Sequence, residues 1–250
     1  MRLRPARSSD LLRPHWALRL YPQAAEAGGC LRVPEPRGSS SWGSDPERAA
    51  LEAVRRARAK IRRYAVANRL NRFGTLTYAG EGCRDPEQLR EDVPTFFREL
   101  RPALGGKRLP YVWVPEWHPG GHGLHVHFAV GRYVPQPLIR DVWERGHVFI
   151  KLLSDLPVGS GAVEEARVAA RYLSKYVGKG FGDERRRAGL HRYEVAQGFQ
   201  PEKLVLTGRS DEDVLAQASD EMGAAPEKVW RSSTVEGWHG PPAVWAAWPE

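Results

Sequence analysis

The chain has 250 residues, of which 41% are apolar, so it is long enough to build one large domain with a sizeable core. No apolar run approaches the length of a membrane span, and the basic N-terminus has no apolar stretch behind it, so we expect no membrane segment, no secretory signal and a cytoplasmic protein. The net charge of +8 is concentrated in residues 1–72, where 16 Arg and Lys stand against six Asp and Glu, and this predicts a surface that meets nucleic acid.

The N-terminal third is predicted to hold an arm and then a basic helix. Residues 1–43 are rich in Pro, Gly, Ser and Arg, and we expect a basic, poorly structured arm there. Ser44 and Glu47 form a capping box that starts a helix running to about Asn68. A solvated helix face is the ordinary explanation for its charges, and contacts with DNA phosphates are the functional one. The arginines expected to make these contacts are Arg55, Arg56, Arg62 and Arg63.

The middle of the chain alternates strands and helices. The apolar patterns predict an order of strand, helix, strand, strand, helix, strand and then a further helix, within a domain of residues 44–181. The expected strands are 73–78, 111–117, 123–130 and 147–153, and the expected helices begin near 85, 137 and 163. We expect the helix from residue 85 to be interrupted or restarted at Pro94. This order predicts an α+β fold, a split β-α-β-β-α-β antiparallel sheet with helices packed on one face.

Residues 182–250 form a C-terminal extension to which the sequence assigns no role. A helix over 211–222 and a strand-like stretch over 228–238 are expected within it. Cys30 and Cys83 are the only cysteines, and they are interpreted as free thiols in a reducing compartment, with a single disulfide as the alternative.

A histidine pair on a predicted strand is the first pattern that carries chemistry. Side chains alternate along a strand, so His125 and His127 share one face while Val126 and its apolar neighbours point into a core. Glu116, on the preceding strand, is expected to complete a metal site of two histidines and a carboxylate, which leaves positions open for water and a phosphate oxygen. His118 or His122 is the alternative third ligand, and a merely solvent-exposed pair is the ordinary alternative to a metal site.

A pair of tyrosines on a predicted helix is the second pattern. Tyr172 and Tyr176 are four residues apart and therefore lie on one side, and Lys175 and Lys179 each follow a tyrosine by three residues. A free tyrosine has a pKa of about 10, so it needs help to attack a phosphate. Nearby lysine charge and a metal-polarised phosphate provide that help. Aromatic residues at the edge of a core are the ordinary alternative.

Together these segments resemble three motifs of the HUH endonucleases, in the family's order. Residues 73–78 are similar to its first motif, residues 123–128 to its metal-binding histidine-hydrophobic-histidine motif, and residues 172–179 to its tyrosine motif. The resemblance covers roughly residues 45–181 and is strongest to the rolling-circle replication initiators, or Rep proteins, of small plasmids and single-stranded DNA phages.

The resemblance implies a reaction at single-stranded origin DNA. A tyrosine attacks one phosphodiester, which leaves a free 3′-hydroxyl for a polymerase and a 5′-phosphotyrosine link. It implies Tyr176 as the primary nucleophile and Tyr172 as a second one for strand transfer, with Mg²⁺ or Mn²⁺ as the metal, although two imidazoles alone would also accept Zn²⁺. No phosphate-loop motif is present, so we expect a host helicase as well as a host DNA polymerase among the partners.

Other functions were weighed against this one. Relaxases of the same superfamily place the tyrosine before the histidines, which does not fit, whereas a single-strand transposase is harder to separate. A non-catalytic nucleic-acid-binding module is the alternative from another class, since the split sheet also binds RNA through aromatic side chains on its surface. The expected surface here carries histidines instead, which favours the enzyme.

Overall fold

The computed structural model describes residues 13–34, 46–152, 162–179 and 191–249, so the predicted helix cap at Ser44 lies outside the described residues. The chain divides into two compact units. The central unit is residues 45–200, and the terminal unit combines residues 1–44 with residues 201–250. The fold is α+β with antiparallel sheets, as the sequence predicts.

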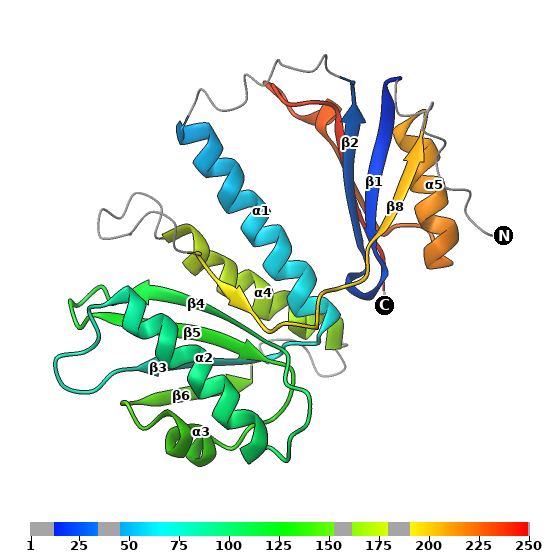
Figure 1. Ribbon diagram of the computed structural model, residues 1–250. Helices are drawn as coiled ribbons and strands as arrows, with labels where there is room; N and C mark the ends of the chain where they lie inside the picture. The colour runs from blue at the N-terminus through cyan, green and yellow to red at the C-terminus, as the bar shows by residue number, and fades with distance from the viewer. Residues whose placement is uncertain (1–12, 35–45, 153–161, 180–190, 250) are drawn as a thin grey trace. The chain divides into compact units, whose positions relative to one another are not determined.

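The central unit is built on a five-stranded sheet in the order β6-β3-β5-β4-β7 (Figure 1). The strands are β3 (Arg72–Thr77), β4 (Tyr111–Trp117), β5 (Leu124–Val130), β6 (Val148–Leu152) and β7 (Glu194–Val195). The helices are α1 (Pro46–Ala67), α2 (Pro86–Ala103), α3 (Gln136–Trp143) and α4 (Ala162–Lys179). The order from β3 to α4 confirms the predicted succession of strands and helices. The helix α2 runs without a break through Pro94, which corrects the expected interruption.

Helices cover both faces of this sheet, whereas the sequence led us to expect them on one face. On one face, α2 and α3 pack against the alternate residues of β4 and β5 that include Trp113, Val126 and Phe128. On the other face, α1 and α4 pack against Phe73 and Ala129. The apolar stripes of α1 and α4 require burial just as those of α2 and α3 do, and a helix preceding the split motif and one following it fill the second face.

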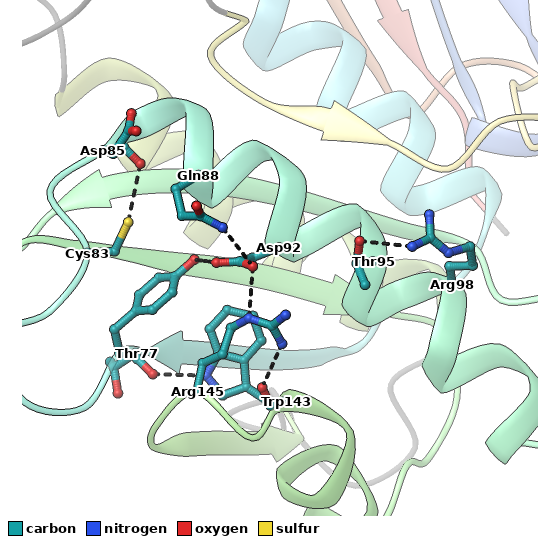
Figure 2. Close-up of polar contacts among 10 residues, drawn as sticks. Thr77, Cys83, Asp85, Gln88, Asp92, Thr95, Arg98, Trp143 and Arg145 are labelled. Atoms are coloured by element: carbon teal, nitrogen blue, oxygen red, sulfur yellow. Dashed lines mark hydrogen bonds and ion pairs between the residues drawn. The ribbon is translucent and has the colours of Figure 1, made fainter.

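A buried polar network holds α2 to the ends of β3 and α3 (Figure 2). The Nε atom of Arg145 donates to Asp92 Oδ1 at 2.8 Å, and the Tyr78 hydroxyl donates to Asp92 Oδ2 at 3.0 Å. Burial, followed by the charge of Asp92, raises the pKa of Tyr78. The indole N–H of Trp143 donates to the carbonyl oxygen of Thr77 at 2.9 Å. Asp92 is only 6% exposed, so its carboxylate depends on these donors for the hydrogen bonds that water would supply.

The terminal unit joins the two ends of the chain in a second five-stranded sheet, in the order β8-β1-β2-β10-β9. Its strands are β1 (His15–Tyr21), β2 (Glu26–Arg32), β8 (Leu204–Gly208), β9 (Lys228–Arg231) and β10 (Ala243–Ala247). The helix α5 (Asp211–Met222) starts at a capping box on Ser210 and packs on Leu18, Leu20 and Val244.

The hairpin of β1 and β2 departs from the expected poorly structured arm, and the C-terminal extension shares a sheet with it. Leu18 and Leu20 alternate with exposed or half-buried residues, but the surrounding Pro, Gly and Arg hid that pattern. Both cysteines are free thiols, as expected. In the part of the chain that the structure describes, no helix is long and apolar enough to cross a membrane.

Candidate active site

The strand register brings Glu116 to the two histidines. β4 and β5 pair without a bulge, so Glu116 lies directly opposite His125, and Val114 lies opposite His127. Residues 112, 114 and 116 therefore share the sheet face of the histidines. Pro115 is accommodated because β7 pairs with β4 only as far as Trp113, beyond which that side of β4 is a free edge among the described residues.

The ligand atoms of these three residues converge on one point. The Nε2 atoms of His125 and His127 lie 3.1 Å and 2.8 Å from Glu116 Oε2, and the two nitrogens are 3.0 Å apart. Ligands about 2.1 Å from one ion and at right angles around it are roughly 3 Å apart, which is the spacing found here. This candidate metal group confirms Glu116 as the third member, in preference to His118 or His122.

The surroundings of the histidines suit a metal ion. His125 and His127 are only 6% and 7% exposed, so a charge on either ring would need a partner. The Nδ1 atom of His127 lies 3.1 Å from the Thr75 hydroxyl on β3. A proton held on Nδ1 by that oxygen leaves Nε2 free to bind a metal, which is the usual arrangement around a ligating histidine. Two imidazoles and one carboxylate are a donor set that divalent cations accept.

The tyrosine helix lies on the same sheet face as the metal group. Tyr172, Tyr176 and Leu173 of α4 belong to the cluster that covers Phe73 and Ala129. The Tyr176 ring stacks on the His127 ring, with centroids 3.7 Å apart. The Tyr172 ring meets the Phe73 ring edge to face at 4.7 Å. Both predicted nucleophiles are thus gathered at the histidines, with Tyr176 in direct contact.

The environment keeps the Tyr176 hydroxyl protonated. Burial raises the pKa of Tyr176 above its ordinary value of 10, and a hydrogen bond to Tyr172 and the negative charge of Glu116 raise it further. A neutral phenol is a weak nucleophile, so positive charge must be brought to this site before the oxygen can attack.

Positive charge lies nearer to Tyr172 than the sequence alone indicated. The Lys175 ammonium lies 5.2 Å from the centre of the Tyr172 ring, and the Lys151 ammonium, from β6, lies 5.7 Å from it. Lys179 ends α4, but its side chain lies outside the described residues.

Three residues in the site were not assigned from the sequence. They are Phe73, Thr75 and Lys151. Phe73 and Thr75 alternate on β3, and Thr75 pairs with His127 across the sheet, so the period of two would have placed both on the histidine face. Lys151 comes from the opposite edge strand, and nothing in the sequence relates it to the tyrosine helix.

The arginines expected to contact DNA all lie on α1. Arg55 and Arg56 are exposed, and Arg55 forms an ion pair with Glu52 at 2.8 Å. Arg62 and Arg63 are half-buried. The helix α1 packs against α4, and the Arg58 guanidinium donates to the carbonyl oxygen of Ser174 at 3.2 Å, so these arginines belong to the helix beside the tyrosines.

One comparison with known proteins gives a match. A family model described as replication-associated protein, of the ORF2 type, matches residues 71–181, which span β3 to the end of α4 and include the whole metal group and both tyrosines. Over this segment the chain is similar to that family. No curated protein and no solved structure matches the chain.

Proposed function

We propose that this protein is a metal-dependent HUH-type endonuclease that nicks and rejoins single-stranded DNA to initiate rolling-circle replication. The similarity to replication-associated proteins over residues 71–181 supports a replication initiator that binds DNA. The observation that carries the enzymatic part is the stacking of Tyr176 on His127, because it brings a hydroxyl-bearing side chain to the ligands of a candidate metal site.

His125, His127 and Glu116 would hold the ion, Mg²⁺ or Mn²⁺ by resemblance. When bound, the ion supplies positive charge that polarises the scissile phosphate. Thr75 orients the His127 ring through Nδ1, and Lys175 and Lys151 add positive charge beside Tyr172.

The proposed reaction is a transesterification by Tyr176. Its hydroxyl oxygen forms a bond to phosphorus while the bond from phosphorus to the 3′-oxygen breaks. The phenolic proton passes to solvent, and the departing 3′-oxygen takes a proton to become the 3′-hydroxyl that a host polymerase extends. The number of phosphodiester bonds is unchanged, so the stored 5′-phosphotyrosine can later be attacked by a 3′-hydroxyl to rejoin the strand.

The packing of α1 and α4 disfavours a purely binding role for the central sheet. An RNA-binding sheet of this topology presents bases with an open aromatic surface. Here helices cover both faces of the sheet, and the histidine face is closed by α1 and α4 apart from the site itself. This arrangement favours chemistry at a confined site over stacking along a surface.

Formation of a covalent adduct tests the proposal. Labelled single-stranded candidate origin DNA and Mn²⁺ should yield a protein–DNA species that survives denaturation. The same reaction with Y172F/Y176F protein, or with wild-type protein in excess chelator, should yield none. Absence of an adduct from the wild-type protein across all candidate origin strands would contradict the enzymatic proposal.

A further inference from the structure

A pocket of about 450 Å³ opens at the edge of the central sheet, apart from the metal group. It lies between the C-terminal half of α2, the start of β4 and the segment that follows β7. Its volume is in the range of pockets that bind small organic ligands, and it suits a single nucleotide.

The pocket is strongly positive. Arg98, Arg101 and Arg108 contribute to its lining, and no carboxylate does. Among the described residues, none of these three arginines has an acidic partner. Arg98 donates to the hydroxyl of Thr95 at 3.0 Å (Figure 2), and Arg108 donates to the carbonyl oxygen of Gly198 at 2.8 Å. Neutral acceptors orient these groups without cancelling their charge, so the pocket offers a site for an anion.

Aromatic rings stand beside these cations. The Tyr111 ring lies flat against the Phe97 ring at 3.7 Å, and the Arg108 guanidinium lies 4.6 Å from the centre of the Phe199 ring. Arginine and aromatic side chains together are the chemistry that binds single-stranded nucleic acid, since the cation meets the phosphate and the ring meets the base. An inorganic anion alone would have no use for the rings.

The pocket and the metal group lie toward opposite ends of one strand. Tyr111 begins β4 and lines the pocket, whereas Glu116 is five residues further along. At about 3.3 Å per residue the two are separated by roughly 17 Å along the strand. Tyr111 also packs with the α2 side of the sheet, while Glu116 is on the α4 side. A ligand in the pocket is therefore not at the reaction centre.

We propose that this pocket binds one nucleotide of the single-stranded DNA, several nucleotides away from the phosphate that is cleaved. The proposal rests on the proposed function, because it takes the substrate strand as the ligand. The pocket fixes the position of the strand by holding a phosphate between arginines and a base against an aromatic ring. It supplies affinity for the flanking strand and takes no part in bond breaking.

The test measures binding of a labelled single-stranded oligonucleotide by fluorescence anisotropy at increasing salt. The variant R98Q/R101Q removes two exposed charges from the pocket, and the control R140Q/R209Q removes two exposed charges elsewhere. We expect R98Q/R101Q to reduce the log–log salt slope by about 1.4, since each lost single-strand phosphate contact removes about 0.7. The control should keep the wild-type slope. Binding of dTMP is measured in parallel.

The outcomes separate the pocket from the proposed function. An unchanged slope in R98Q/R101Q, while the wild type still forms its covalent adduct, would overturn the pocket and leave the enzyme. Equal loss in both variants would attribute binding to overall charge and also overturn the pocket. Tighter binding of dTMP than of the oligonucleotide, lost in R98Q/R101Q, would reassign the pocket to a free nucleotide. The expected slopes without any adduct would retain the pocket and contradict the enzymatic function.

Discussion

The ring of Tyr176 stacks on the ring of His127, with centroids 3.7 Å apart and planes 25° from parallel. One residue comes from the helix α4 and the other from the central strand β5. The contact is possible because α4 buries Ala169, Ala170 and Leu173 on the sheet face that carries the histidines. The same apolar stripe that folds the helix onto the sheet therefore also delivers a phenol to the candidate metal group.

The metal ligands are the first target for mutation. H125A or H127A should abolish cleavage, because each removes one of only two imidazoles, while binding of single-stranded DNA is largely retained. Titration calorimetry with Mn²⁺ should show the loss of the ion directly. H191A changes an exposed histidine of the same unit and should behave as wild type. Cleavage at the wild-type rate in excess chelator would contradict the metal site.

Thr75 is predicted to support the metal through His127. T75V keeps the shape of the side chain but removes the hydroxyl that lies 3.1 Å from Nδ1. Loss of such an outer contact typically weakens metal affinity by about 10- to 100-fold. T75S, which restores a hydroxyl, should recover most of the affinity for Mn²⁺. Equal affinities of T75V and wild type would show that the hydroxyl does not orient the ring.

The arginines of α1 are predicted to contact DNA phosphates. R55Q/R56Q changes the two exposed members and should lower the log–log salt slope of single-strand binding by about 1.4, at about 0.7 for each contact. Adding R62Q and R63Q should bring the reduction to about 2.8, with circular dichroism as a check because those side chains are half-buried. A slope equal to that of wild type would assign the helix to a solvated face.

The Asp92 network is predicted to stabilise the fold without serving the reaction. D92N removes the charge that accepts from Arg145 and Tyr78, and should lower the free energy of unfolding by about 2–3 kcal/mol. This is below the cost for a fully buried pair, because the Arg145 side chain is 35% exposed. Urea denaturation measures the effect, and E99Q on the exposed side of α2 is the control. A D92N protein as stable as wild type would remove the network from the stability of the unit.

Much of the central unit could be predicted from the sequence, because its signals are local. The alternation around Val126 fixes which way the histidines point, and the spacing of Ala166, Ala170 and Leu173 fixes the buried side of α4. The terminal sheet could not be predicted, because β1 pairs with β8, nearly the whole chain away, and no local pattern specifies a partner. Lys151 was missed for the same reason.

The final prediction assigns different roles to the two tyrosines. Tyr176 contacts His127, whereas Tyr172 lies one turn earlier against Phe73 and between Lys175 and Lys151. Y176F should therefore lose nearly all initial nicking, while Y172F should still nick but join strands poorly, since rejoining after a replication round needs a second attack. Removing a hydroxyl leaves the ring packing intact, so circular dichroism should be unchanged and a large loss of rate is chemical. Peptide mapping of the trapped DNA adduct decides the matter. An adduct found only on Tyr172 would reverse the assignment, because the residue nearest the metal group would then not be the one that attacks.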